Sequence, residues 1–226
     1  NMRENRGHAR CNAFGLRYIN SNISCDYVIV MDSDGEDRPA EIKELLKKIT
    51  ESPEISVVAR RIKRSEGLIF KSLYQIHKLI TFIFTGHKVN FGNYSCLIKK
   101  DIDILYNKPS LWSSYSGTVK KHLSKLNEIK SIRGQRYYGP SKMSFFNLII
   151  HSFSIIAVFK NVVFLRSALI IVMLSFLQNL LGFTVIFLQI LIVIFNLFIF
   201  GVSLRENEKD LVNSDKNILN EENVVQ

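Results

Sequence analysis

The sequence predicts an α/β domain with a three-layer sheet, followed by an amphipathic helix at a membrane surface and a C-terminal pair of membrane-spanning helices. Two observations carry this prediction. An apolar strand, a proline-opened amphipathic helix and a second apolar strand follow one another between residues 26 and 59, an order typical of a parallel sheet. Further along, Ser167 to Leu204 contains no Asp, Glu, Lys, Arg or His, which is long enough for two short spans or one long one.

The predicted sheet domain covers residues 1–142. Its expected elements are helices at 8–18, 40–50, 68–84, 101–106 and 120–127, and strands at 26–31, 55–59, within 85–98 and at 129–136. Pro39 opens the second helix in a favoured first-turn position. The apolar face of that helix is formed by Ile42, Leu45, Leu46 and Ile49, which recur at helical spacing.

The remaining residues predict a membrane attachment. Residues 143–161 have the apolar, charge-poor pattern of a helix lying along a bilayer surface. We expect two spans within 162–204, near 163–181 and 184–204, with the turn marked by Gln178, Asn179 and Gly182. The alternative is a buried helical hairpin of a soluble protein. The polar tail, residues 205–226, is expected to be disordered.

Four carboxylates follow the first predicted strand, namely Asp32, Asp34, Glu36 and Asp37. Like charges repel, so this cluster costs stability unless a cation or hydrogen-bond donors lie among them. Ligands gather at the carboxyl ends of strands in open α/β sheets, and carboxylate oxygens suit Mg²⁺ or Mn²⁺ together with phosphates. The pair Asp32 and Asp34 therefore predicts a cation and diphosphate site. A solvated acidic loop, or a helix cap made by Asp37, are the alternatives.

Charge indicates the partners. The formal net charge is +10, and the tail from Arg205 has three basic and six acidic residues, which leaves +13 on residues 1–204. A basic body beside a membrane anchor predicts an anionic lipid surface or a phosphorylated substrate. No nucleic-acid partner is expected, because no recognition motif is visible. The basic body should stay in the cytoplasm, attached to the cell inner membrane by two spans. Three scattered cysteines fit a reducing compartment.

Several motifs carry a family resemblance. "YVIVMDSDGEDRPAEIKELL" resembles the central motif of family 2 glycosyltransferases of the GT-A fold, in particular the polyprenyl-phosphate sugar transferases such as dolichol-phosphate mannose synthase. "NRGHARCNAFGL" is similar to the family's Asn-x-Gly-x-x-x-Ala helix, and "RYYGPSKMS" resembles its Arg-x-x-Gly-Glu-Ser-Lys element. The resemblance covers most of residues 5–204. It implies transfer of a sugar from a nucleoside-diphosphate donor to a polyprenyl phosphate or lipid-linked glycan, in a bacterial branch linked to surface-polysaccharide synthesis.

The resemblance also implies roles for single residues. Asp32 and Asp34 would be the catalytic pair that holds the metal and the donor diphosphate. Glu36 stands where the family usually has Gln, a further metal or phosphate contact. Arg60 or Arg61 matches the family's basic residue after the next strand, which would meet a phosphate. The family's late basic loop, which closes near the phosphates, is matched by Arg136, Ser141 and Lys142.

The chain departs from the family pattern in two places. Gly92-Asn93-Tyr94-Ser95 stands where related transferases often have Gly-Asp-Phe-Arg, so neutral groups replace a charge pair. The family's first β–α unit, which recognises the nucleotide base, is not seen ahead of Asn5. Two hypotheses follow: the sequence is a fragment of a longer enzyme, or it is a truncated, catalytically inactive homologue that acts as a membrane scaffold. Homo-oligomerisation is left open.

Overall fold

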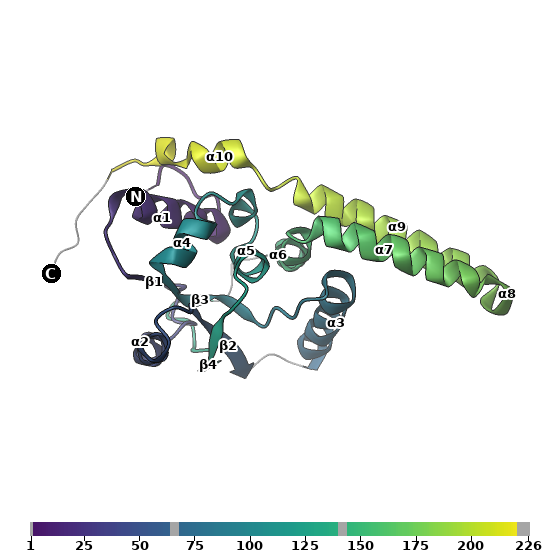
Figure 1. Ribbon diagram of the computed structural model, residues 1–226, viewed down its shortest axis with the longest axis horizontal. Helices are drawn as coiled ribbons and strands as arrows, with labels where there is room; N and C mark the ends of the chain where they lie inside the picture. Colours follow the sequence, from purple (N-terminus) through teal and green to yellow (C-terminus); the bar gives the residue numbers. More distant parts are fainter. Residues whose placement is uncertain (1, 64–67, 140–143, 221–226) are drawn as a thin grey trace. The chain divides into compact units, whose positions relative to one another are not determined.

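The chain divides into two structural units, and it enters the second unit twice (Figure 1). The computed structural model describes residues 2–63, 68–139 and 144–220. Unit 1 comprises Asn1–Arg64, Asn90–Pro140 and Glu206–Gln226, and unit 2 comprises Ser65–Val89 and Ser141–Arg205. This division differs from the expected one, because the helix near residues 68–84 belongs to unit 2 and the tail belongs to unit 1.

Unit 1 is built on a four-stranded sheet with the order β1-β3-β2-β4. The strands are β1 (Tyr27–Val30), β2 (Val57–Lys63), β3 (Phe91–Ile98) and β4 (Asn127–Ile132). β3 pairs antiparallel with both β1 and β2, whereas β2 and β4 pair in parallel. The expected parallel sheet is therefore wrong. The β–α–β segment does place β1 and β2 in the same direction, but its crossover leaves a gap between them, which the later strand β3 fills.

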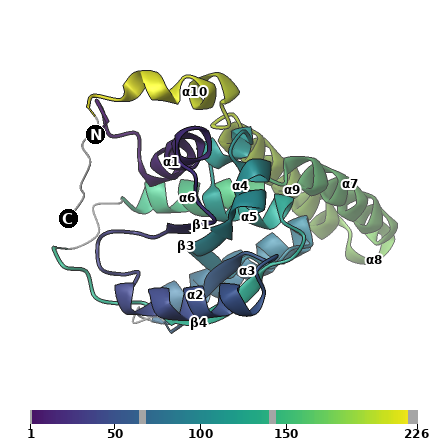
Figure 2. The ribbon, with the colours of Figure 1, turned by 60° about the vertical axis from the view of Figure 1, so that its left-hand side comes forward.

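Successive side chains of β3 point to opposite faces of the sheet. Tyr94, Cys96 and Ile98 lie in one buried cluster with Leu45 and Ile49. These two residues belong to α2 (Ile42–Glu51), which follows the short 3-10 helix η1 (Pro39–Glu41). The predicted apolar face is confirmed for Ile42, Leu45 and Ile49, which cover one side of the sheet (Figure 2), whereas Leu46 is exposed.

The opposite face of β3 meets α4 (Lys99–Leu105) and α5 (Tyr115–His122). The Oγ atom of Ser95 lies 2.6 Å from the hydroxyl oxygen of Tyr115, and both residues are buried. Outside them, α1 (His8–Asn22) packs on α4, on α5 and on the 3-10 helix η2 (Pro109–Trp112). The three-layer arrangement is confirmed (Figure 2).

The helix predicted at 120–127 is wrong. The Oγ atom of Ser114 accepts a hydrogen bond from the backbone N of Gly117 at 3.3 Å, so α5 begins at Tyr115. The backbone turns extended at Leu123, and β4 begins at Asn127. The Ser114 cap therefore starts the helix earlier than predicted, and the weak helical pattern after His122 does not extend it.

Residues 206–220 of the tail are folded in unit 1, so the expected disorder is wrong for these residues. They form α10 (Glu208–Val212), in contact with α1 and η2, and the 3-10 helix η3 (Ser214–Asn217), in contact with α1. Leu211 is fully buried. Met2 and Ile218 form an antiparallel bridge, and the backbone N of Arg3 donates to the backbone O of Asn217 at 2.8 Å. Composition alone misses this docking, because one buried leucine and a few backbone hydrogen bonds stabilise it.

Unit 2 is helical. Its helices are α3 (Leu68–Thr85), α6 (Phe145–Ala157), α7 (Lys160–Phe176), α8 (Gln178–Leu181) and α9 (Phe183–Ser203). α9 packs on α6 and α7, and Figure 1 shows α8 at the connection between α7 and α9. The amide of Gln189 on α9 donates to the backbone O of Ile171 at 3.2 Å and to the Oγ of Ser175 at 2.9 Å. These contacts hold α7 along α9.

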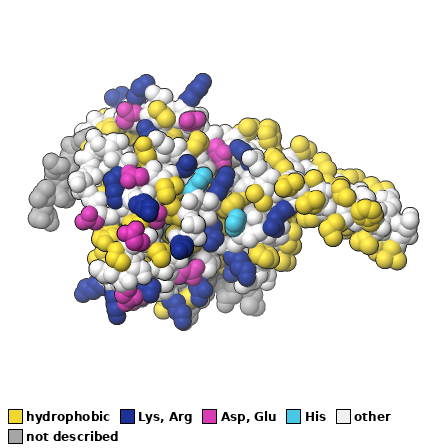
Figure 3. All heavy atoms as spheres, viewed as in Figure 1, with side chains coloured by type: hydrophobic (Ala, Val, Ile, Leu, Met, Phe, Trp, Pro, Cys, Tyr) yellow, Lys and Arg dark blue, Asp and Glu magenta, His cyan; other side chains and the backbone are white. Residues whose placement is uncertain are grey.

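The length and polarity of these helices bear on the expected spans. Within the described residues, one helical stretch, Phe183–Val212, is long and apolar enough to cross a membrane. Phe146–Ala157 and Lys160–Phe176 pass the same test only as a pair, and they are bent by 84° where they meet. The surface over α7 to α9 is mainly hydrophobic (Figure 3), with Phe176 83% exposed. The described residues therefore do not cover these side chains as a soluble core would.

Replacing Leu211 tests the docked tail. We expect Leu211→Ala to weaken docking by about 2–4 kcal/mol, because it removes a fully buried side chain. In detergent-solubilised protein, trypsin should then cleave at Lys209 and Lys216 much faster than in the wild type. Val212→Ala is the matched control, since this neighbour is exposed. Equal cleavage of all three proteins would contradict the docking.

Candidate active site

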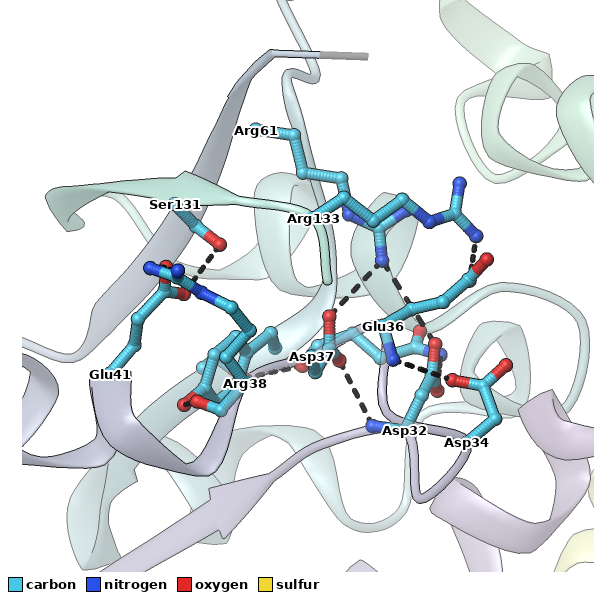
Figure 4. Close-up of polar contacts among 12 residues, drawn as sticks. Asp32, Asp34, Glu36, Asp37, Arg38, Glu41, Arg61, Ser131 and Arg133 are labelled. Carbon is cyan, nitrogen blue, oxygen red and sulfur yellow. Dashed lines mark hydrogen bonds and ion pairs between the residues drawn. The ribbon is translucent and has the colours of Figure 1, made fainter. Parts of the chain in front are cut away.

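Four carboxylates lie on the loop that follows β1 (Figure 4). We call this segment, Asp32 to Asp37, the acidic loop. The loop turns sharply at Gly35, whose φ of +92° is one that residues with a Cβ rarely adopt. The Oδ1 atom of Asp34 accepts a hydrogen bond from the backbone N of Glu36 at 3.1 Å, which closes the turn. The turn keeps the side chains of Asp34 and Glu36 close to each other.

Asp37 is the buried member of the cluster, with only 2% of its surface exposed. Its Oδ2 accepts from the backbone N of Asp32 at 2.9 Å, and its Oδ1 lies 3.4 Å from the Nη2 of Arg61 on β2. Burial raises the pKa of Asp37, while the Asp32 backbone and Arg61 oppose that rise. The helix-cap alternative is wrong: Arg38 occupies the cap position of η1, with no side-chain cap bond. Asp37 instead fixes Asp32 and Arg61.

A second loop brings positive charge, and Arg133 to Tyr137, directly after β4, is named the basic loop. The Nη2 atom of Arg133 contacts the Oε2 of Glu36. The Nε of Arg136 donates to the Oε1 of Glu36 at 2.9 Å, and its Nη2 lies 3.3 Å from the Oδ2 of Asp34. Burial lowers the pKa of Arg133, and the neighbouring Arg136 adds to this. The two loops thus compensate each other's charge.

Backbone hydrogen bonds also join the two loops. The backbone N of Gly134 donates to the O of Glu36 at 2.8 Å, and the backbone N of Tyr137 donates to the O of Asp34 at 2.9 Å. A Cβ on Gly134 would collide with the backbone O of Gly35. Glycine at this position therefore permits the close approach.

Asn93 and Glu41 complete the polar surroundings. The Nδ2 of Asn93 on β3 donates to the Oδ1 of Asp32 at 3.1 Å. Glu41 is buried and accepts from Ser131 Oγ at 2.7 Å and Arg38 Nε at 3.0 Å, which ties the start of α2 to β4. Asn93 therefore belongs to the site, whereas Glu41 supports the scaffold beside it.

The structure brings together most of the residues predicted for the site. Those that converge are Asp32, Asp34, Glu36, Arg61 and Arg136. Arg60 does not join them: successive strand residues face opposite sides, and its Nη1 lies 3.5 Å from the Oε2 of Glu128. Ser141 and Lys142 lie outside the described residues.

Sequence reasoning missed three participants. The local pattern offers Asp37 as a helix cap, the family resemblance makes Asn93 a departure from a motif, and Arg133 matches none of the family motifs. The available signal for Arg133 was its place three residues before Arg136, in a loop that follows a strand. Its partner Glu36 lies 97 residues earlier in the chain, which no local pattern predicts.

The carboxylates of Asp32 and Asp34 reach solvent, which suits a cation shared with a bound ligand better than a metal site closed by protein side chains. Among the described residues, no group of three or more His, Cys, Asp and Glu side chains is arranged to hold a metal ion. The side chains of Asp32 and Asp34 are 32% and 36% exposed. A magnesium ion held by one or two carboxylates keeps its other positions for water and phosphates. Among the described residues, three guanidinium groups face the four carboxylates of the acidic loop, and the excess of negative charge within this set favours a cation.

Removing Asp37 tests the buried part of the cluster. We expect Asp37→Ala to lower the free energy of unfolding by about 3–5 kcal/mol, because it leaves Arg61 without its nearer carboxylate. Chemical denaturation of the purified protein measures this. Asp103→Ala is the control, because Asp103 forms an exposed pair with Lys99 and should cost at most about 1 kcal/mol. Equal losses in both variants would argue against a structural role for Asp37.

Comparison with known proteins identifies the family. No curated protein matches the sequence. A family model described as "Glycosyl transferase family 2" matches residues 1–113 of the 226. The matched half contains the acidic loop, Arg61 and Asn93, while the basic loop lies beyond it. The chain belongs to glycosyl transferase family 2 and is therefore a transferase enzyme.

Proposed function

We propose that this transferase moves a sugar from a nucleoside-diphosphate donor to a polyprenyl phosphate or a lipid-linked glycan at a membrane surface, with Mg²⁺ or Mn²⁺ as cofactor. Glycosyl transfer itself follows from the family. The observation that carries the donor class is the pair Asp32 and Asp34 at the end of β1, faced by Arg61 from β2 and Arg136 from the loop after β4.

Asp32 and Asp34 are the residues that would hold the cation. Asp32 is fixed on two sides, since its backbone N donates to Asp37 and its side chain accepts from Asn93. Asp34 is fixed by the backbone N of Glu36. When bound, the cation neutralises charge that builds up on the departing diphosphate.

The guanidinium groups are suited to the donor phosphates. Arginine offers planar, paired donors that match phosphate oxygens. In the transfer, the bond between the anomeric carbon and the diphosphate oxygen breaks, and the diphosphate keeps the electron pair. Arg61 and Arg136 would stabilise that negative charge. The new bond joins the anomeric carbon to the acceptor oxygen.

The surroundings of the carboxylates favour a phosphate acceptor. A hydroxyl acceptor needs a base to take its proton, whereas an ionised phosphate oxygen can attack without one. Each carboxylate of the acidic loop already accepts a hydrogen bond from an arginine, an asparagine or a backbone N. These carboxylates belong to Asp32, Asp34, Glu36 and Asp37. This engagement supports a polyprenyl phosphate over a glycan hydroxyl.

The helices of unit 2 support membrane attachment. The 21 residues of α9 extend about 32 Å, close to the roughly 30 Å hydrocarbon core of a bilayer. α7 has 17 residues and is followed by α8. Their exposed apolar side chains need a non-aqueous environment. We propose α7 with α8 as the first span and α9 as the second, with α6 at the bilayer surface.

The docked tail supports an even number of crossings. The chain enters unit 2 after Pro140 and returns to unit 1 at Glu206. Leu211 and Ile218 then pack or pair within unit 1. Both ends of the membrane segment therefore lie on the side of unit 1. Because basic segments tend to remain in the cytoplasm, we place unit 1 on the cytoplasmic side of the inner membrane.

Activity tests the donor site. We expect Asp34→Ala to lower kcat/KM by roughly 100-fold or more, because a group that stabilises the departing charge is lost. The assay follows release of UDP or GDP from sugar nucleotides by the full chain in lipid, with polyprenyl phosphate. Removal of divalent ions should abolish wild-type turnover, and Mn²⁺ should restore it.

Arginine variants provide matched controls for that assay. Arg61→Gln should reduce turnover, whereas Arg60→Gln should leave it within about twofold, because Arg60 faces Glu128. Full activity of Asp34→Ala would contradict the proposed site. A wild type that uses no sugar nucleotide would favour the scaffold hypothesis instead.

Labelling tests the two-span arrangement. Asn179 lies at the turn in α8 and is exposed. We expect a cysteine in Asn179→Cys to react with a membrane-impermeant maleimide on intact cells with a permeable outer envelope. A cysteine in Asn213→Cys, in the docked tail, should react only in inverted vesicles. Reaction of Asn213→Cys on intact cells would mean an odd number of crossings.

A further inference from the structure

Glu36 holds two arginines of the basic loop, and this arrangement bears on its role. One oxygen of its carboxylate contacts Arg133, and the other accepts from Arg136 at 2.9 Å. Its side chain is only 13% exposed, whereas that of Asp34 is 36% exposed. Both Glu36 oxygens therefore face guanidinium groups, while Asp34 keeps a larger open surface for a cation.

The charge of Glu36 suits it to this position. Two carboxylate oxygens can each accept from one guanidinium. A glutamine has one oxygen and an NH₂ group, which would turn hydrogen-bond donors toward one of the arginines. The backbone bonds from Gly134 and Tyr137 to the acidic loop keep both arginines within reach of Glu36.

We propose that Glu36 is a positioning residue, which sets Arg133 and Arg136 beside the Asp32–Asp34 pair so that both arginines bind the phosphates of an anionic diphosphate ligand. Arg133 is then a further phosphate-binding residue of the transferase. This inference rests on the proposed diphosphate donor. It assigns the cation to Asp32 and Asp34 alone, in contrast to the role that family resemblance implies for Glu36.

The proposal separates two affinities. A cation ligand contributes to Mn²⁺ binding even without nucleotide, whereas a residue that positions arginines contributes mainly to diphosphate binding. Two residues acting through one contact should also be coupled, so that removing the second costs little once the first is gone.

The experiment is a double-mutant cycle in the full chain in lipid, with Glu36→Gln, Arg133→Gln and the combination. Calorimetry measures Mn²⁺ affinity alone, and then UDP or GDP affinity at saturating Mn²⁺. We expect each single variant to bind the diphosphate about tenfold more weakly, with Mn²⁺ affinity within about threefold of the wild type. The double variant should be no weaker than the weaker single variant. Arg60→Gln is the control and should change neither affinity.

Limited trypsin digestion without ligand adds a readout that needs no donor. Wild-type protein should resist cleavage after Arg133 and Arg136, and Glu36→Gln should be cut there readily. Digestion of both proteins at the same rate would overturn the positioning role, because Glu36 would then not hold the basic loop.

The binding results can also overturn the proposal. A tenfold or greater loss of Mn²⁺ affinity in Glu36→Gln but not in Arg133→Gln, with additive effects in the double variant, would make Glu36 a cation ligand. A wild type that binds Mn²⁺ but no diphosphate would refute the donor class, and with it the phosphate role of Arg133. Trypsin protection would still report separately whether Glu36 holds the loop.

Discussion

Repulsion among four carboxylates on one loop is the constraint that organises unit 1. A loop with this charge is stable only if donors and positive groups from elsewhere in the fold reach it. Arg61 arrives from β2, Asn93 from β3, and Arg133 and Arg136 from the loop after β4. The sheet order β1-β3-β2-β4 is what makes these strands available at one place.

The cluster divides into an inner and an outer part with different tasks. Asp37 is buried, so its contacts to the Asp32 backbone and to Arg61 stabilise the fold. Asp32 and Asp34 remain partly exposed and are not fully neutralised, which is the state a cation site requires. The same loop therefore supplies its own structural support and the exposed carboxylates that we propose bind the cation.

Much of this could be predicted from local patterns, and the failures have physical causes. The opening at Pro39 and three residues of the apolar face of α2, Ile42, Leu45 and Ile49, follow from proline geometry and helical periodicity, while the fourth expected residue, Leu46, is exposed. The insertion of β3 between β1 and β2 depends on pairing between residues far apart in sequence. The order of the tail depends on the burial of Leu211, which average composition cannot detect.

In the candidate site, too, local patterns predict some residues and contacts between distant segments determine others. Asp32 and Asp34 could be identified because they directly follow a strand, and strand ends collect ligands. Arg60 and Arg61 could not be separated by motif alone, but strand alternation turns only Arg61 toward the acidic loop. Arg133 required knowledge of which loop lies against Glu36. The contacts that decide roles are thus mostly those between distant segments.

The central claim is that Asp32 and Asp34 share a cation with a bound diphosphate. The most direct measurement is an anomalous difference map from crystals of the full chain grown with Mn²⁺ and UDP or GDP. The account predicts one strong peak within about 2.0–2.3 Å of oxygens from Asp32 or Asp34 and from the diphosphate. The carboxylate of Glu36 should still contact Arg133 and Arg136. A diphosphate bound without Mn²⁺ at this pair, or a peak elsewhere, would contradict it.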